Sequence, residues 1–156
     1  MNTSPPRVAT LADLDAIAPL FDAYRQFYAQ PPDPALATRF IRERMQNNES
    51  AILLAFDANA RAIGFCQLYP SFCSVEAQPI YVLYDLFVAP EARRTGAGKA
   101  LLLAAEQLAI ANGKVRMDLT TARVNARAQS LYESLGWVRD KVFYAYSRHP
   151  GMKEPT

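Results

Sequence analysis

Residues 93–99 gather chemical groups that bind phosphate, and they lie between a hydrophobic strand and an apolar helix. The stretch reads Arg93, Arg94, Thr95, Gly96, Ala97, Gly98 and Lys99. Gly96 and Gly98 let the backbone approach a ligand closely, and the cationic side chains attract negative charge. Residues 100–109 are strong helix formers, so the loop leads into a first helical turn, whose unpaired N–H groups bind anions. The stretch therefore predicts a site for a phosphate group.

The glycine spacing excludes two common nucleotide-binding loops. A nucleoside-triphosphate loop needs four residues between its first glycine and Gly-Lys-Ser/Thr, but here Ala97 alone separates the glycines and Ala100 follows Lys99. A dinucleotide loop needs a further glycine at the position of Leu101. Taken alone, the loop leaves open a solvated glycine-rich turn with arginines at the surface.

Two motifs in the chain resemble those of the GCN5-related N-acetyltransferases (GNAT superfamily). Arg93-x-x-Gly96-x-Gly98 resembles the Arg/Gln-x-x-Gly-x-Gly/Ala signature of that family. Residues 125–137 resemble its Asn-x-x-Ala-x-x-x-Tyr-x-x-x-Gly-Phe motif, with Trp137 where phenylalanine is usual. The resemblance extends from about residue 7 to residue 147. Within the superfamily, the chain is most similar to the histone and polyamine acetyltransferase branch.

The resemblance implies a fold and a reaction. The fold is the α/β acyl-CoA N-acyltransferase fold, a mixed and mostly antiparallel sheet splayed between its fourth and fifth strands and flanked by helices. A single domain over residues 1–156 is expected, with a homodimer as the working unit. The reaction is transfer of an acetyl group from acetyl-CoA to a primary amine by direct attack. The acceptor is a small polyamine-like amine or a lysine side chain of a peptide.

For the donor, the resemblance implies roles along the central strand, the loop and the second motif. Backbone groups of residues 94–99 bind the pyrophosphate, supported by the guanidinium of Arg93 or Arg94, a choice that the sequence leaves open. The strand carries a bulge, and the backbone near Leu86, Phe87 and Val88 pairs with the pantetheine arm. Tyr132 is the general acid toward the coenzyme A sulfur, although a half-buried aromatic on an amphipathic helix is the plain structural alternative. Asn125 either caps its helix or binds pantetheine.

For the acceptor, Asp85 is the one carboxylate within the central strand. It can bind a cationic substrate, relay a proton through water as a base, or pair with a nearby cation. Tyr84 stands where the related enzymes often have a glutamate, which argues against a direct glutamate base there. The remaining substrate-binding candidates are Tyr24, Tyr28 and Glu76, together with Tyr84. Tyr24 and Tyr28 share one helical face, and core packing explains them equally well.

Composition narrows the function classes. At 156 residues with 51% hydrophobic and 21% charged residues, the chain is typical of a globular domain, and a net charge of +2 gives no argument for nucleic acid. Without an apolar span or signal peptide in the sequence, a cytoplasmic protein and no membrane partner are expected. Cys66, Cys73 and His149 have no metal-ligand spacing, so no metal is predicted. A non-catalytic acyl-CoA sensor and a nucleotide-phosphate binder are the alternative functions.

The hydrophobic pattern predicts the elements that position these residues. A short strand over 7–10 precedes a helix to about residue 28, which Pro19 is expected to kink or interrupt. Pro34 starts a second helix to about residue 47. The remaining expected elements are a hairpin of 51–56 and 62–69, a loop over 70–79, a strand over 80–88, a helix to about 112, a strand over 115–120, a helix over 125–136, and one or two strands over 137–147.

Overall fold

The computed structural model describes residues 4–153. The chain divides into two compact units, Met1–Thr120 and Thr121–Thr156. We call the described part of the first the sheet unit (residues 4–120) and that of the second the C-terminal unit (residues 121–153).

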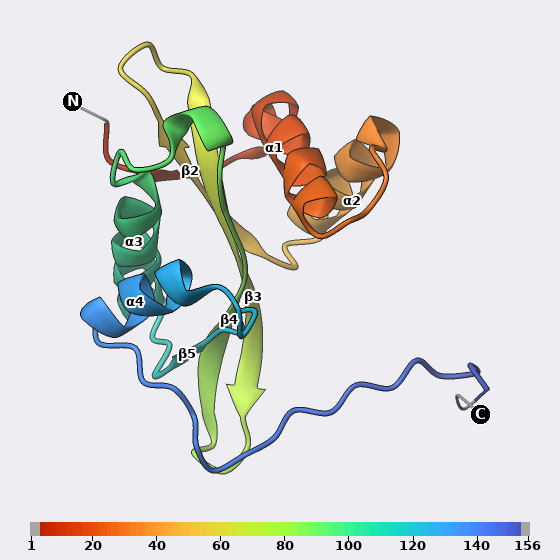
Figure 1. The fold of residues 1–156 in the computed structure, drawn as a ribbon, viewed down its shortest axis with the longest axis vertical. Helices are drawn as coiled ribbons and strands as arrows, with labels where there is room; N and C mark the ends of the chain where they lie inside the picture. Colours follow the sequence, from red (N-terminus) through yellow and green to blue (C-terminus); the bar gives the residue numbers. More distant parts are fainter. Residues whose placement is uncertain (1–3, 154–156) are drawn as a thin grey trace. The chain divides into compact units, whose positions relative to one another are not determined.

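The sheet unit is built on a mixed five-stranded sheet (Figure 1). Its strands lie in chain order: β1 (Arg7–Val8), β2 (Ala51–Phe56), β3 (Ala62–Cys73), β4 (Gln78–Val88) and β5 (Met117–Asp118). The first four strands pair antiparallel, whereas β5 lies parallel to β4 and pairs only with Tyr81 and Val82. The rest of β4 therefore diverges from β5. This confirms the predicted mixed, mostly antiparallel sheet that splays between its fourth and fifth strands.

Helices cover both faces of this sheet (Figure 1). On one face lie α1 (Leu14–Phe27), preceded by a 3-10 turn at Leu11–Asp13, and α2 (Pro34–Gln46). On the other face lies α3 (Ala97–Ala111), which follows a 3-10 turn at Pro90–Ala92. The apolar residues of α1 recur at helical spacing and form the main core with the sheet: Leu14, Ile17, Leu20 and Phe21 pack with Ile52, Leu54, Phe65 and Phe87.

Pro19 does not interrupt the first helix, contrary to one of the two outcomes predicted for it. The helix α1 runs without a break from Leu14 to Phe27. Pro19 is exposed while its neighbours Ala18 and Leu20 are buried, so its ring lies on the solvent side. Burial of the opposite face holds the helix together there.

The predicted loop over residues 70–79 is wrong. Strand β3 continues to Cys73 and β4 begins at Gln78, so Pro70 and Pro79 lie inside the paired hairpin. Pairing between β2 and β3 begins at Leu68, so Pro70 lies on a part of β3 where one side of the strand is an edge. Proline is tolerated at an edge because the missing N–H interrupts no interior ladder.

The C-terminal unit contains a helix, α4 (Ala126–Ser134), followed by irregular chain. The predicted strands over 137–147 are therefore wrong, and the predicted strand over 115–120 is reduced to β5. Within the described residues nothing pairs with segment 137–147, and a strand requires a partner for its backbone groups. The apolar side chains of this segment remain exposed, and Tyr144 has 85% of its surface open to solvent.

Candidate active site

A β-bulge in β4 determines where Asp85 points. Leu68 of β3 pairs with Leu83, but the adjacent residue Gln67 pairs with Asp85, which leaves Tyr84 as the extra residue. Side chains alternate along a strand, so Leu83 shares the face of Leu68 while Asp85 shares the opposite face with Gln67. The bulge expected from the family resemblance is confirmed.

The face that Asp85 shares is the one covered by α1. Phe65 and Phe87, two positions from Gln67 and Asp85, make ring contacts with Tyr24 of α1. Tyr81, on the far side of the bulge, turns instead to the α3 side, where its hydroxyl accepts a hydrogen bond from Asn112 at 2.7 Å.

The Asp85 carboxyl group is buried, with 3% of the residue exposed. Gln67 donates a hydrogen bond from Nε2 to Oδ2 of Asp85, and Gln67 Oε1 accepts one from the Ser50 hydroxyl at 2.8 Å. Burial raises the pKa of Asp85, while hydrogen bonds from Gln67 and Tyr24 oppose that rise. Among residues 4–153, no Lys, Arg or His side chain forms an ion pair with it.

Tyrosines surround this carboxyl group. The Tyr24 hydroxyl donates to the Tyr84 carbonyl at 3.4 Å, and the ring of Tyr24 lies edge-on to that of Tyr28 with centroids 5.1 Å apart. Tyr69 and Tyr84 form a second edge-on pair at 5.6 Å. Burial is the larger cause and the nearby Asp85 charge the smaller cause of a raised pKa at Tyr24. The same two causes raise the pKa of Tyr69 to about 12. These hydroxyls therefore stay protonated at neutral pH and serve as donors.

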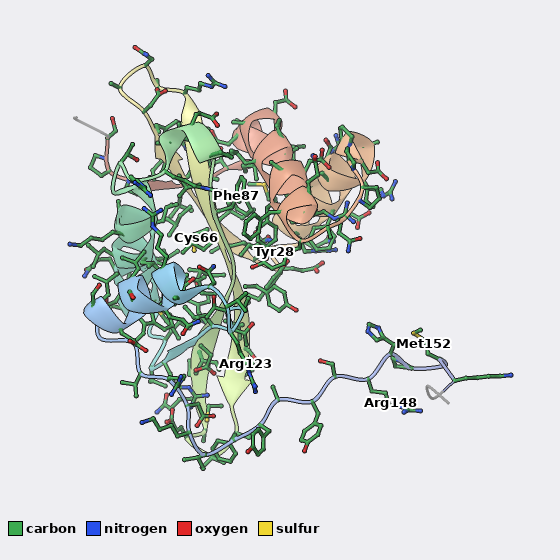
Figure 2. All side chains as sticks on the ribbon, in the orientation of Figure 1. Tyr28, Cys66, Phe87, Arg123, Arg148 and Met152 are labelled. Carbon is green, nitrogen blue, oxygen red and sulfur yellow. The ribbon has the colours of Figure 1, made fainter. Side chains whose placement is uncertain are left out.

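The acceptor candidates divide into those that gather around Asp85 and one that does not. We call Tyr24, Tyr28, Tyr69, Tyr84 and Asp85 the acceptor cluster. Figure 2 shows two labelled residues of this region, Tyr28 and Phe87, where α1 meets the sheet. Glu76 lies elsewhere, in the turn between β3 and β4, where it forms an ion pair with Arg116 at 3.5 Å.

The loop of residues 93–99 has the backbone geometry of an anion site. Arg94 (φ 67°) and Gly96 (φ 85°) both adopt left-handed conformations, and such alternation turns successive N–H groups toward one side. The first intrahelical hydrogen bond of α3 runs from Ala100 N–H to the Gly96 carbonyl, so the N–H groups of residues 97–99 have no intrahelical partner. A side chain at Gly96 would meet no atom within 4 Å, so its backbone lies open to a ligand.

The two adjacent arginines differ in orientation. Arg93 donates from Nε to the Val88 carbonyl at 3.1 Å, and its guanidinium lies over the rings of Phe27 and Phe87 at 5.7 and 5.8 Å. Arg93 thus braces the end of β4. Arg94 is exposed on the loop itself. The geometry therefore favours Arg94 as the side chain that meets phosphate.

The end of β4 supplies a backbone edge with which no strand among residues 4–153 pairs, although Arg93 occupies the Val88 carbonyl. Leu86, Phe87 and Val88 pair with β3 on one side, but β5 ends its pairing at Val82. An extended ligand can pair with such an edge as an added strand.

In the C-terminal unit the second motif forms a capped helix. The Asn125 side chain accepts a hydrogen bond from the Ala128 N–H at 3.2 Å, which is the capping role left open by the sequence. Gly136 (φ 90°) ends the helix and lets the Trp137 N–H return to the Tyr132 carbonyl at 3.0 Å. Tyr132 is half-buried, with its ring centroid 6.2 Å from that of Trp137.

Sequence reasoning missed Gln67, Ser50 and Tyr69. The available signal was Gln67, a glutamine inside the otherwise apolar run of residues 62–69. A buried polar side chain in such a run requires a partner.

Comparison with known proteins identifies the family. The model of the acetyltransferase (GNAT) family matches residues 15–137, which include the loop and both motifs. The chain belongs to the GNAT family. It is an acetyl-CoA-dependent N-acetyltransferase, as the family match and relatives named acetyltransferases show.

Individual GNAT relatives agree with this assignment. The chain is 48% identical over 140 residues to the uncharacterized N-acetyltransferase YhfO of Bacillus subtilis, covering 90% of this chain and 93% of the relative. A crystal structure described as a probable acetyltransferase has a TM-score of 0.87 at 39% identity, covering 98% of this chain and all (100%) of that one. The structure of AAC(6')-Iy in complex with the bisubstrate analog CoA-S-monomethyl-acetylneamine has a TM-score of 0.76 at 22% identity, covering 96% of this chain and 100% of that one. That last likeness concerns the fold.

Two kinds of feature are absent from residues 4–153 of the GNAT chain. No group of three or more His, Cys, Asp and Glu side chains there is arranged to hold a metal ion. No helix in that range is both long enough and apolar enough to cross a membrane.

Proposed function

We propose that this GNAT enzyme acetylates a small cationic amine or a lysine side chain, and that Asp85 recognises the ammonium group and receives its proton. The observation that carries the proposal is a carboxylate buried among tyrosines, with which no Lys, Arg or His side chain of residues 4–153 forms an ion pair. A buried charge ordinarily requires a partner of opposite charge. A substrate ammonium supplies that charge.

The acceptor cluster suits an amine in a second way. Tyrosine rings attract cations through their faces, and Tyr24, Tyr28, Tyr69 and Tyr84 come from α1, β3 and β4. Tyr84, with 68% of its surface exposed, is the most accessible of them. An aminoglycoside or polyamine, with several ammonium groups, fits this chemistry better than an apolar amine.

Proton transfer follows from the pKa values. A primary amine has a pKa of about 10, so it enters protonated and must lose a proton before attack. Asp85 accepts that proton, directly or through one water, and its raised pKa makes it a better base than an ordinary aspartate. The freed amine then attacks the acetyl carbonyl, a C–N bond forms and the C–S bond breaks. The second proton on the nitrogen leaves to water as the amide forms, and water returns a proton to the phenoxide of the general acid.

The donor side uses the loop and the open edge of β4. The bound acetyl-CoA supplies an activated thioester. N–H groups of residues 94–99, with Arg94, hold its pyrophosphate, and the backbone of Leu86, Phe87 and Val88 holds the pantetheine arm. An N–H of that edge stabilises charge on the carbonyl oxygen as the bond forms.

Tyr132 completes the reaction as general acid. Its phenol is protonated at neutral pH and gives its proton to the departing thiolate. The assignment is supported by the position of Tyr132 in the Asn125–Trp137 motif and by the capped helix that carries it. We propose that Asn125 contributes by capping α4, the helix that carries Tyr132.

A homodimer is the proposed working unit. The C-terminal unit exposes Val142, Phe143, Tyr144 and Tyr146, and exposed apolar groups of this kind mark contact surfaces. Light scattering of the purified chain measures this directly. A cytoplasmic location and the absence of a nucleic-acid partner stay predictions from composition.

The decisive experiment is a panel of amines scored by release of free coenzyme A thiol. The panel contains polyamines, aminoglycosides, amino acids and lysine peptides. Turnover is expected with multiply charged amines, and Asp85→Asn is expected to abolish the preference for them. Turnover confined to amines that carry no second positive charge would contradict the proposed acceptor.

A further inference from the structure

Gln67 is the most completely buried polar side chain in the acceptor region. It has 0% of its surface exposed and sits in the middle of β3, flanked by Cys66 and Leu68, which are also fully buried. Both ends of its amide are engaged, Nε2 with Asp85 and Oε1 with Ser50. A polar group in such a place costs stability unless it does something that an apolar residue cannot.

The direction of these hydrogen bonds depends on the charge of Asp85. An ionised carboxylate only accepts hydrogen bonds, so Gln67 must present its NH2 group to it. The amide oxygen then faces Ser50, whose hydroxyl donates at 2.8 Å. Ser50 follows α2 directly before β2, so the orientation of the amide is held from a neighbouring strand.

Few other groups favour the charged form of Asp85. The titratable groups that face it within the sheet unit come from three elements: Tyr24 from α1, Cys66 and Tyr69 from β3, and Tyr84 from β4. The charges of Arg44 and Glu49 act on the Tyr69 hydroxyl. Burial raises the pKa of the Cys66 thiol and those of the Tyr24 and Tyr69 hydroxyls, so these three groups remain neutral. Gln67 is therefore the donor directed at this carboxylate alone, whereas the single Tyr24 hydroxyl proton is shared between Asp85 and the Tyr84 carbonyl.

We propose that Gln67 is a positioning residue that keeps Asp85 ionised and fixes its orientation at the acceptor cluster, with Ser50 setting the direction of the amide. The inference rests on the proposed function, because it concerns the base assigned there. Tyr24 approaches Asp85 from α1, but Gln67 lies opposite it across the β3–β4 pairing, where backbone register fixes the distance.

Three variants test the inference. Gln67→Met keeps the approximate shape and removes both hydrogen-bonding ends. Gln67→Glu keeps the shape and replaces the donor by a second carboxyl group, so that the two acids share a proton. Ser50→Ala removes only the hydroxyl that orients the amide. Thermal unfolding of each variant reports whether it folds.

The readout is the pH at which Asp85 titrates, measured in two ways. Carbon-13 NMR of labelled aspartate follows the carboxyl carbon of Asp85, assigned by its loss in Asp85→Asn. The pH profile of kcat/KM follows the same ionisation in the reaction. In Gln67→Met both midpoints are expected to rise by about one pH unit, so that kcat/KM on the acid limb falls about tenfold and recovers at alkaline pH. The rise is larger in Gln67→Glu and smaller in Ser50→Ala.

The outcomes separate this inference from the proposed function. An unchanged carboxyl titration in Gln67→Met, with activity lowered equally at every pH, would show a structural role alone and overturn the inference. If Gln67→Met does not fold, an unchanged titration in Ser50→Ala overturns it. Full activity in Asp85→Asn would instead overturn the proposed function, whatever the carboxyl titration shows.

Discussion

The two proposed proton-transfer groups, Asp85 and Tyr132, belong to regions of opposite physical character. Asp85 lies in a sheet unit whose core contains fully buried residues from α1, α2, β2 and β3. Tyr132 lies on α4, and none of the described residues 121–153 is buried. One group is held by packing on every side, whereas the other is held by a helix cap and a turn.

This difference separates two ways of preparing a side chain for chemistry. For Asp85 the protein changes the chemistry of the group, because burial and two donors set its pKa. The role proposed for Tyr132 calls for a phenol that carries its proton, which is the ordinary state of a phenol at neutral pH. The proposed role of Tyr132 requires that its hydroxyl be positioned close to the departing thiolate. Substitutions around Asp85 should therefore change pH dependence, and those around Tyr132 should change rate at every pH.

The largest expected effect comes from Asp85→Asn. Loss of a general base is expected to lower kcat/KM by about 10³-fold. The matched control is Asp22→Asn, since Asp22 is also buried but accepts hydrogen bonds from Gln26 and the Asp33 N–H at the α1–α2 connection. Asp22→Asn should lower the melting temperature and leave kcat/KM within a few-fold. Steady-state thiol release checks both, and equal losses of activity would remove the distinction between the two carboxylates.

Tyr132→Phe is expected to lower kcat by about 10²-fold, with the pH midpoint of the acid limb unchanged. Tyr144→Phe in the same unit, an exposed tyrosine outside the motif, should have no effect. A shifted acid midpoint in Tyr132→Phe would mean that the two groups titrate together, and the contrast drawn above would fail.

The buried charge of Asp85 is expected to reduce stability at neutral pH. A folded pKa above the ordinary value means that the folded protein holds its proton more tightly than the unfolded chain does. The tighter binding of this proton stabilises the folded protein. That stabilisation is complete below about pH 4 and is lost as pH rises through the pKa of Asp85 in the folded protein. Above that range Asp85→Asn should be more stable than the original chain. Urea unfolding from pH 4 to 8 measures it, and parallel stability curves would contradict the expectation.

Arg94→Ala is expected to raise KM for acetyl-CoA about tenfold with little change in kcat, since a charge-assisted contact to phosphate is lost. Added salt should shrink the difference because it screens such contacts. Arg93→Ala should act differently and lower kcat, because Arg93 braces the Val88 carbonyl. A raised KM for acetyl-CoA in Arg93→Ala together with a lowered kcat in Arg94→Ala would exchange the roles of the two arginines.

The smallest expected effects come from one change made in both regions. Asp33 caps α2 in the sheet unit by accepting from the Leu36 N–H, and Asn125 caps α4. Changing either residue to alanine should lower the stability of the helix that it caps by about 1 kcal/mol. Asp33→Ala should lower global stability without changing activity. Asn125→Ala should increase hydrogen exchange in α4 and lower kcat. Equal protection of α4 in both variants would argue against local control of Tyr132.

The sequence predicted the parts of the fold that local rules govern. Residues 51–56 read as a strand and form β2, and Pro34 starts α2 as the first-turn preference for proline predicts. The predictions were wrong where pairing between strands determines whether a segment becomes a strand. Proline argued for a loop at residues 70–79, but edge pairing overrode it. Residues 137–147 had the composition of strands but have no partner among the described residues.

The candidate site divides in the same way. Asp85 and the loop at 93–99 could be found from residue types and motifs, and the structure adds the geometry around them. The contribution of Ser50 and Gln67 could not be predicted, since a one-residue bulge at Tyr84 decides which face of β4 meets Gln67. No local pattern in the sequence specifies which residue of β3 lies opposite Asp85 of β4.

The order of the strands across the sheet has a consequence for how the chain is made. Because β1 to β5 lie side by side in the order of synthesis, each strand finds its neighbour already released from the ribosome. The β1–β2 and β4–β5 pairings each wait for a longer stretch, but those stretches hold helices, α1 with α2 in the first and α3 in the second, which form locally. A sheet assembled largely from adjacent segments has low contact order, which favours rapid folding. The sheet that carries Asp85 is therefore able to form before the segment that carries Tyr132 has emerged from the ribosome.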